Sequence, residues 1–202
     1  DARLLKGEDM FSEKFSAVID LPEDYEVYDF TTGYDPDRIR ASEYGIGRYN
    51  EKRPSMYSHE MYQGNQRDIH MGVDIAAPVG TPIKSFYDGE IFLYANNNQP
   101  GDFGYTIVTK HIIANKTLYA LFGHLSSSSL QGISVGQKLS QGEVFCWVGD
   151  KNENGGWNPH LHFQLSWLEP KIADMPGVVS EEDLSRSLQV YPDPRLVLGK
   201  IY

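Results

Sequence analysis

Between residues 67 and 168 the sequence alternates between strand-like and turn-like segments, and this pattern limits the chain to a fold built mainly from short strands. Runs rich in Val, Ile, Phe and Tyr are separated there by turns rich in Gly, Pro and Asn. The predicted strands cover residues 72–76, 81–86, 89–95, 104–113, 116–123, 143–148 and 161–167. We therefore predict a mostly β fold, an antiparallel β-sandwich or half-open barrel.

The segments on either side of this region have a different character. Residues 1–66 are polar, acidic and tyrosine-rich with weak helical periodicity, which predicts an irregular N-terminal arm that leads into the domain. Residues 169–202 predict a tail packed on the domain, with a short helix that Ser180 caps and a turn at 191–194. The predicted organisation is thus an arm at 1–66, a domain at 67–168 and a tail at 169–202.

Composition excludes some classes of partner. The formal net charge of -10 repels phosphate backbones, so nucleic acid is not an expected partner, and a cationic or neutral substrate is easier to accommodate. Cys146 is the only cysteine, which excludes an intrachain disulfide, and its apolar neighbours predict a buried core side chain. No apolar run is long enough to span a membrane. The chain begins with Asp1 rather than Met, so a removed leader is compatible with it and the compartment stays open.

Two short motifs contain side chains that bind metals well. In the first, His70 and Asp74 stand four residues apart, and Gly72 between them would let the backbone bend so that both reach one ion. Alone this motif is weak, because a surface histidine before a strand is the simpler interpretation of it. In the second, His160 and His162 stand two apart in a predicted strand, so both imidazoles project from one face. That spacing favours metal binding or catalysis over a pair of exposed histidines.

A third motif, Gly123-His124-Leu125, closes a predicted strand, and a lone histidine in such a place is usually structural. Taken together, however, the three motifs resemble those of the lysostaphin/LytM-type metallopeptidases, which carry H-x-x-x-D, a strand-end His-Leu and H-x-H in this order. The matching context includes the glycine- and proline-containing run that starts at Gly72 and the Pro159 that precedes the last motif. The resemblance covers about half of the chain.

This resemblance implies the fold, the cofactor and the roles of five residues. The fold would be a narrow antiparallel β-groove with one zinc ion per chain on its floor, bound by His70, Asp74 and His162. His124 and His160 would be catalytic, and the sequence does not separate the base from the acid. Three protein ligands leave one coordination position open, as in catalytic zinc sites. A zinc ion there would lower the pKa of a bound water and stabilise the oxyanion formed on an amide carbonyl.

The sequence departs from the family pattern at several positions. Phe122 stands where many members have tyrosine, which removes a hydroxyl, and Gln164 stands where glutamate is common. The loop at 96–103 is longer than the usual turn of the family, and the loop at 151–158 replaces a short Gly/Ser/Thr segment. We expect both loops to form walls of the groove. Substrate preference is therefore the property that is least safely inferred from the family. The stretches at 47–53, 67–70, 100–104, 154–157 and 191–194 carry a further resemblance, from about Gly45 to Leu198, to the peptidase-like module of kinase–peptidase–aminotransferase fusion proteins.

The predicted function is that of a zinc metalloendopeptidase that hydrolyses a peptide bond, with peptidoglycan peptide or a small peptide-like compound as substrate. The alternative is a non-catalytic module that binds peptide or glycan in the same groove and regulates a partner; a structural zinc ranks lowest. The fusion resemblance implies a cytoplasmic location, and otherwise the location is periplasmic or secreted. The N-terminal arm could occlude the groove and offer His59, Glu60 or Asp68 as a fourth ligand, although ordinary surface residues are the simpler interpretation.

Overall fold

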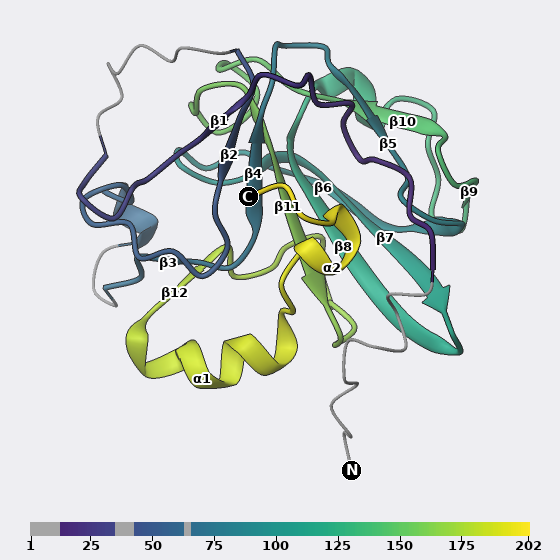
Figure 1. Ribbon diagram of the computed structural model, residues 1–202. Helices are drawn as coiled ribbons and strands as arrows, with labels where there is room; N and C mark the ends of the chain where they lie inside the picture. Colours follow the sequence, from purple (N-terminus) through teal and green to yellow (C-terminus); the bar gives the residue numbers. More distant parts are fainter. Residues whose placement is uncertain (1–12, 35–42, 63–65) are drawn as a thin grey trace.

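The computed structural model describes residues 13–34, 43–62 and 66–202, and its main element is one large open sheet (Figure 1). All neighbouring strands in this sheet pair antiparallel except the first two, which are parallel. The sheet does not close into a barrel within the described residues, so the predicted mostly β, half-open fold is confirmed. Its strand order is β1 (Glu26–Val27), β2 (Gly45–Gly47), β4 (Val73–Ala76), β11 (His160–Ser166), β8 (Lys116–Leu125), β7 (Gly104–Ile113), β6 (Gly89–Asn97) and β9 (Lys138–Leu139).

Two small sheets and a few short helices complete the described chain. β5 (Pro82–Lys84) pairs with β10 (Val144–Trp147), and β3 (Ile69–His70) pairs with β12 (Val178–Val179). Short 3-10 helices cover Glu60–Tyr62 and Ser127–Leu130. The helices α1 (Glu181–Val190) and α2 (Arg195–Leu198) follow β12, and α1 runs along one end of the molecule (Figure 1).

The turn between β7 and β8 determines how these two strands pair as a long hairpin. Ala114 and Asn115 connect the two strands, and both have a positive φ, of 48° and 62°. Two such residues make the tight turn whose twist matches that of antiparallel strands, and asparagine tolerates this conformation better than most residues. The hairpin carries β8 back across the sheet, so that its last residues reach β11.

The larger of the core clusters lies on one face of the large sheet, and both flanking segments contribute to it. Phe122 and Phe163 of the sheet are fully buried there. Val18 and Ile19 of the N-terminal arm are 1% and 3% exposed, and Val197 of the tail is 6% exposed, in the same cluster. The arm is irregular over most of its described length, as predicted, yet it also adds β1 and β2 to the sheet. The predictions for residues 1–12, 35–42 and 63–65 lie outside the described residues.

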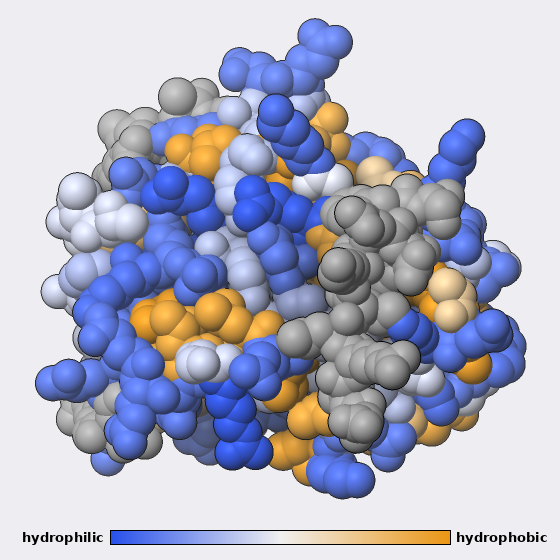
Figure 2. Space-filling model, turned by 60° about the horizontal axis from the view of Figure 1, so that its bottom comes forward, coloured by the Kyte–Doolittle hydropathy of each residue, from blue (hydrophilic) through white to orange (hydrophobic). Residues whose placement is uncertain are grey.

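The tail contains the short helix that the sequence predicts. Ser180 precedes α1 and accepts a hydrogen bond from the backbone N–H of Asp183, so the predicted capped helix is confirmed. None of the described helices has the length and apolar character needed to cross a bilayer. Figure 2 shows a mainly hydrophilic face on which hydrophobic side chains form separate groups.

Candidate metal centre

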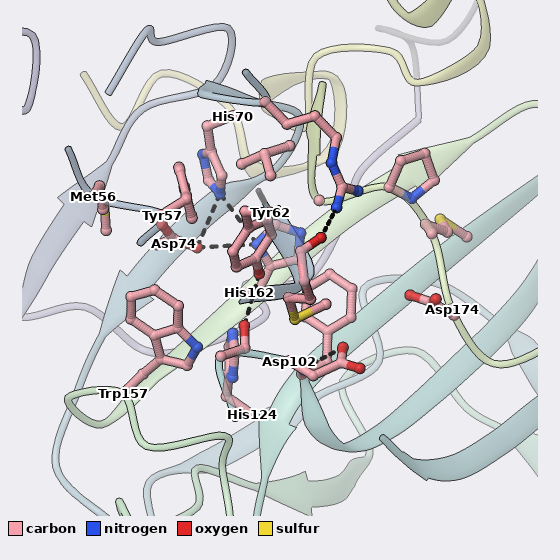
Figure 3. A pocket seen from close by; sticks show the side chains of 18 of the residues that line it. Met56, Tyr57, Tyr62, His70, Asp74, Asp102, His124, Trp157, His162 and Asp174 are labelled. Carbon is pink, nitrogen blue, oxygen red and sulfur yellow. Dashed lines mark hydrogen bonds and ion pairs between the residues drawn. The ribbon is translucent and has the colours of Figure 1, made fainter. Parts of the chain in front are cut away.

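Three side chains meet where β3, β4 and β11 come together. His70 ends β3, Asp74 lies in β4, and His162 of β11 is the direct cross-strand partner of Asp74. Asp74 Oδ1 lies 3.2 Å from His70 Nε2 and 3.1 Å from His162 Nδ1, and the two ring nitrogens are 3.1 Å apart. All three sequence-predicted ligands are therefore brought together as a triangle of donor atoms (Figure 3).

Hydrogen bonds on the far side of each ring fix which nitrogen carries the proton. His70 Nδ1–H donates to the carbonyl of Arg48 at 2.9 Å, which leaves a lone pair on Nε2. His162 Nε2–H donates to Gln164 Oε1 at 2.9 Å, which leaves a lone pair on Nδ1. The amide of Gln164 is oriented in turn, because its Nε2 donates to the carbonyl of Pro176 at 3.2 Å.

The triangle has the size and chemistry that a small cation requires. A tetrahedral zinc ion about 2.0–2.1 Å from each donor separates the donors by about 3.3 Å, close to the distances found here. Two nitrogen lone pairs and a carboxylate oxygen at such short range repel one another, and a cation among them removes that repulsion. The set of two imidazoles and one carboxylate also leaves a fourth position open. His70, Asp74 and His162 could therefore hold a zinc ion.

The ionisation states of the triangle suit metal binding. Burial lowers the pKa of His70 to about 4, so its ring is neutral at pH 7. Burial opposes ionisation of Asp74, but the neighbouring Arg53 guanidinium holds its pKa well below the usual value. Asp74 is consequently a carboxylate, and its second oxygen, Oδ2, accepts from Arg53 Nη1 at 2.7 Å.

The two predicted catalytic histidines lie beside this triangle. The rings of His124 and His160 are 4.3 Å apart, and His160 Nε2 is 3.7 Å from Asp74 Oδ1. His124 Nδ1–H donates to the carbonyl of Asn154 at 2.7 Å, and His160 Nδ1–H donates to that of Asn158 at 2.6 Å. Each ring therefore keeps a lone pair on Nε2. Burial lowers the pKa of both histidines, so both are neutral bases at pH 7.

His124 adopts an unusual backbone conformation that turns it out of the regular strand. Its φ is 63°, in the left-handed region that costs a residue with a Cβ about 1 kcal/mol. The neighbouring chain holds it there, because His124 N–H donates to the carbonyl of Phe103 and Gly149 N–H donates to the carbonyl of His124. Strain of this kind is concentrated at functional sites. The departure at Phe122 does not reach the site, since that ring packs among Phe145 and Phe163 in the core.

The pocket beside the triangle is small, with an aromatic side chain on one wall and two acidic side chains on the other. Trp157 lies on one side, Asp102 and Asp174 lie on the other, and Tyr62 crosses in front (Figure 3). Both loops expected to wall the groove therefore do so, through Trp157 and Asp102. The cavity holds about 100 Å³, below the volume of most ligand sites. Burial raises the pKa of Asp102 and, with the neighbouring Asp102 carboxyl, that of Asp174.

Sequence reasoning did not find every residue that shapes this site. Arg53 contacts a predicted ligand but stands in the arm, where an arginine is ordinarily exposed. Gly72 is required for space rather than for a bend, because a Cβ there would lie 2.6 Å from His162 Cε1. Its position between two candidate ligands was the available signal. His59, Glu60 and Asp68 lie outside the metal-binding group of the described residues, and the ring of His59 packs against Trp157.

The comparison with known families agrees with this geometry. The sequence model of Peptidase family M23 matches residues 68–174, about half of the chain and the whole donor triangle. This chain belongs to peptidase family M23. The predicted lysostaphin/LytM-type resemblance is thereby confirmed, whereas the fusion-protein resemblance receives no support.

Similar sequences occur in longer bacterial proteins. The cell division protein DipM of Caulobacter vibrioides is 40% identical over 104 residues, which are 51% of this chain and 15% of that protein. The peptidoglycan DD-endopeptidase ShyA of Vibrio cholerae is 31% identical over 96 residues, 48% of this chain and 20% of that protein. The chain thus spans a fifth or less of these relatives. The catalytic domain of the prophage-encoded M23 protein EnpA from Enterococcus faecalis is 25% identical, with a TM-score of 0.47 over 70% of this chain and 91% of that one.

Proposed function

We propose that this chain is a zinc-dependent peptidase in which His70, Asp74 and His162 hold the metal and His124 and His160 transfer protons. The observation that carries the proposal is the triangle of three lone-pair donors 3.1–3.2 Å apart, with two neutral imidazoles beside it. A structural zinc would use a fourth side chain, and the described residues offer only these three in one group.

Different groups of the site would serve different steps of amide hydrolysis. Zinc, when bound, supplies a Lewis acid that lowers the pKa of a water molecule and polarises an amide carbonyl. His160 Nε2 and His124 Nε2 each carry a lone pair, so either ring could accept a proton from an attacking water molecule. The resulting imidazolium can then deliver a proton to the leaving amine. The backbone carbonyls of Asn154 and Asn158 hold both rings in the required tautomer.

The proposed substrate is a peptide of the peptidoglycan type. Supporting this choice, ShyA, named as a peptidoglycan DD-endopeptidase, is 31% identical over 96 residues of this chain. The indole N–H of Trp157, a residue that lines the pocket, is buried without a hydrogen-bond partner among the described residues, and a substrate carbonyl that reached it would supply one (Figure 3). Asp102 and Asp174 on the opposite wall, with the net charge of -10, suit a substrate that carries an amino group. Such a substrate places the protein in the periplasm or outside the cell.

Metal content and hydrolysis test the proposal together. Elemental mass spectrometry of the purified chain should find about one zinc per molecule, and His162→Ala should lose it. His111→Gln is the matched control, because His111 is equally buried but lies outside the triangle. Wild type that remains metal-free after zinc is supplied would overturn the proposal.

A second variant separates an enzyme from a module that only binds. His124→Ala should keep its zinc but lose hydrolysis of muropeptides or small dipeptides by about 10²–10⁴-fold, because a proton-transfer group is removed while the ligands stay. If zinc-loaded wild type hydrolyses neither class and still binds muropeptides, the chain is a non-catalytic binding module.

A further inference from the structure

We propose that Arg53 is a positioning residue of the metal centre: it selects the Asp74 oxygen that faces the ion and couples the N-terminal arm to metal binding. The inference rests on the proposed function and concerns a residue outside the three ligands. The contacts of the buried Arg53 guanidinium support it.

The guanidinium of Arg53 is completely buried, and described groups surround it on several sides. Its side chain is 0% exposed. Nη1 donates to Asp74 Oδ2 at 2.7 Å and to Tyr57 Oη at 3.1 Å, and Nε donates to Glu51 Oε1 at 3.0 Å. Its carbon lies 5.0 Å from the centre of the Phe30 ring. A buried cation held by two carboxylates is fixed in place, because leaving either carboxylate unpaired would be strongly unfavourable.

The two carboxylate oxygens of Asp74 therefore have different partners. Oδ2 is occupied by Arg53, so only Oδ1 faces His70 and His162. A free carboxylate can rotate and offer both oxygens to one ion, whereas this one cannot. Arg53 therefore sets a single-oxygen ligand and keeps the number of protein donors at three. Outer partners of metal ligands commonly act in this way.

The same segment also orients a second ligand. The carbonyl of Arg48 accepts from His70 Nδ1 at 2.9 Å and from Arg53 Nη2 at 3.3 Å. Glu51 binds the side chains of both arginines, since its Oε2 also accepts from Arg48 Nε at 2.8 Å. Residues 48–53 thus form a rigid unit, here called the arginine turn, behind two of the three ligands.

The backbone beside the arginine turn leaves space for the guanidinium. Gly47 of β2 is the cross-strand partner of Asp74, and a Cβ there would lie 2.7 Å from Arg53 Nη2 and 3.1 Å from Asp74 Oδ2. Any larger residue would displace the ion pair. The strand that the arm adds to the sheet is therefore shaped around the contact between Arg53 and Asp74.

Zinc affinity and cobalt spectroscopy test the inference on the full chain. Arg53→Lys keeps the charge but replaces the planar donor fork with a single ammonium, which cannot hold Asp74, Glu51 and Tyr57 together. We expect its zinc dissociation constant, measured by chelator competition, to rise about 10–100-fold. In the Co²⁺-loaded protein, release of Asp74 Oδ2 should raise the coordination number and weaken the visible absorption bands. A purely structural role for Arg53 would change neither reading in the folded protein.

Two further variants complete the experiment. Lys52→Met is the matched control, because Lys52 is adjacent but exposed and forms its ion pair with the exposed Glu181; its zinc affinity should equal that of wild type. Glu51→Gln, which keeps Arg53 and loosens its anchor, should weaken zinc binding about 3–10-fold, and it decides the outcome if Arg53→Lys does not fold. Folded variants at both positions with wild-type zinc affinity and an unchanged cobalt spectrum would overturn the inference alone, whereas metal-free wild type would overturn the proposed function.

Discussion

At the scale of single residues, Gly72 has the most demanding environment. A Cβ at this position would meet His162 Cε1 at 2.6 Å and the carbonyl of Phe163 at 2.8 Å. Gly72→Ala should therefore displace the imidazole of His162 and weaken zinc binding about 10–100-fold, as measured by chelator competition. Gly132→Ala serves as the control: Gly132 has a positive φ of 74° but nothing within 4 Å, so that variant should lose about 1 kcal/mol of stability and keep its zinc affinity. Equal zinc affinities in the two variants would contradict this prediction.

His111 makes a second prediction, which concerns pH and lies away from the metal centre. Its ring is neutral, with Nδ1–H donating to the carbonyl of Asp88 and Nε2 accepting from Thr109, and burial lowers its pKa to about 4. The unfolded chain therefore takes up a proton near pH 6.5, before the folded chain does. Stability is present above pH 6.5 and is lost as the pH falls toward 4.

The loss attributable to His111 is about 2 kcal/mol between pH 7 and pH 5. Urea denaturation of the zinc-free protein at both pH values measures it, and His111→Gln should show a smaller difference than wild type by this amount. Identical pH dependence in the two proteins would show that His111 does not bury a neutral ring.

The sequence motifs indicated five residues that the structure brings together, but they did not indicate the residues that support them. His70, Asp74 and His162 could be proposed as ligands because three motifs in a fixed order resemble those of a known family, although each motif alone is weak. The role of Arg53 depends on its burial against Asp74, which arises only when β2 pairs with β4. No local pattern marks an arginine that will lie in the interior.

At the scale of elements, the long strands were predictable and the shortest ones were not. β7 and β8 have ten residues each, enough for alternation and turn signals to define them. β2, β3 and β12 have two or three residues each, too few for a sequence pattern; β2 forms by pairing with β4, and β3 and β12 form by pairing with each other. These short strands nevertheless position part of the site, since His70 ends β3.

The short helix Glu60–Tyr62 supports a prediction about access to the pocket. Tyr62 crosses the pocket in Figure 3, and its hydroxyl donates to the carbonyl of Gly101 at 2.7 Å. Tyr62→Phe removes this tie, worth about 1 kcal/mol, so amide hydrogen exchange in residues 56–62 should accelerate about fivefold. Tyr94→Phe, an exposed tyrosine on β6, is the control. Unchanged exchange in Tyr62→Phe would mean that other contacts hold the helix in place.

At the scale of the whole molecule, residues on both sides of the predicted boundaries at 66 and 168 share one sheet and one core. A chain of residues 67–168 alone would lack β2, which covers the edge of β4, and would lose the core contacts of Val18, Ile19 and Val197. We expect this fragment to unfold without a sharp transition in differential scanning calorimetry, whereas the full chain melts cooperatively, because each buried aliphatic side chain contributes about 1.5–3 kcal/mol. A fragment that melts as sharply, and at the same temperature, would show that arm and tail are accessory.

The arginine turn joins the N-terminal arm to the ligands, and this connection has a thermodynamic consequence. If docking of the arm strengthens zinc binding by a given factor, then zinc must strengthen docking of the arm by the same factor. Zinc concentration would thereby become a variable that sets how tightly residues 48–53 are held. Starvation for the metal would not merely empty an active site: it would loosen an edge of the sheet, and proteases that attack unfolded segments would remove the unloaded protein first.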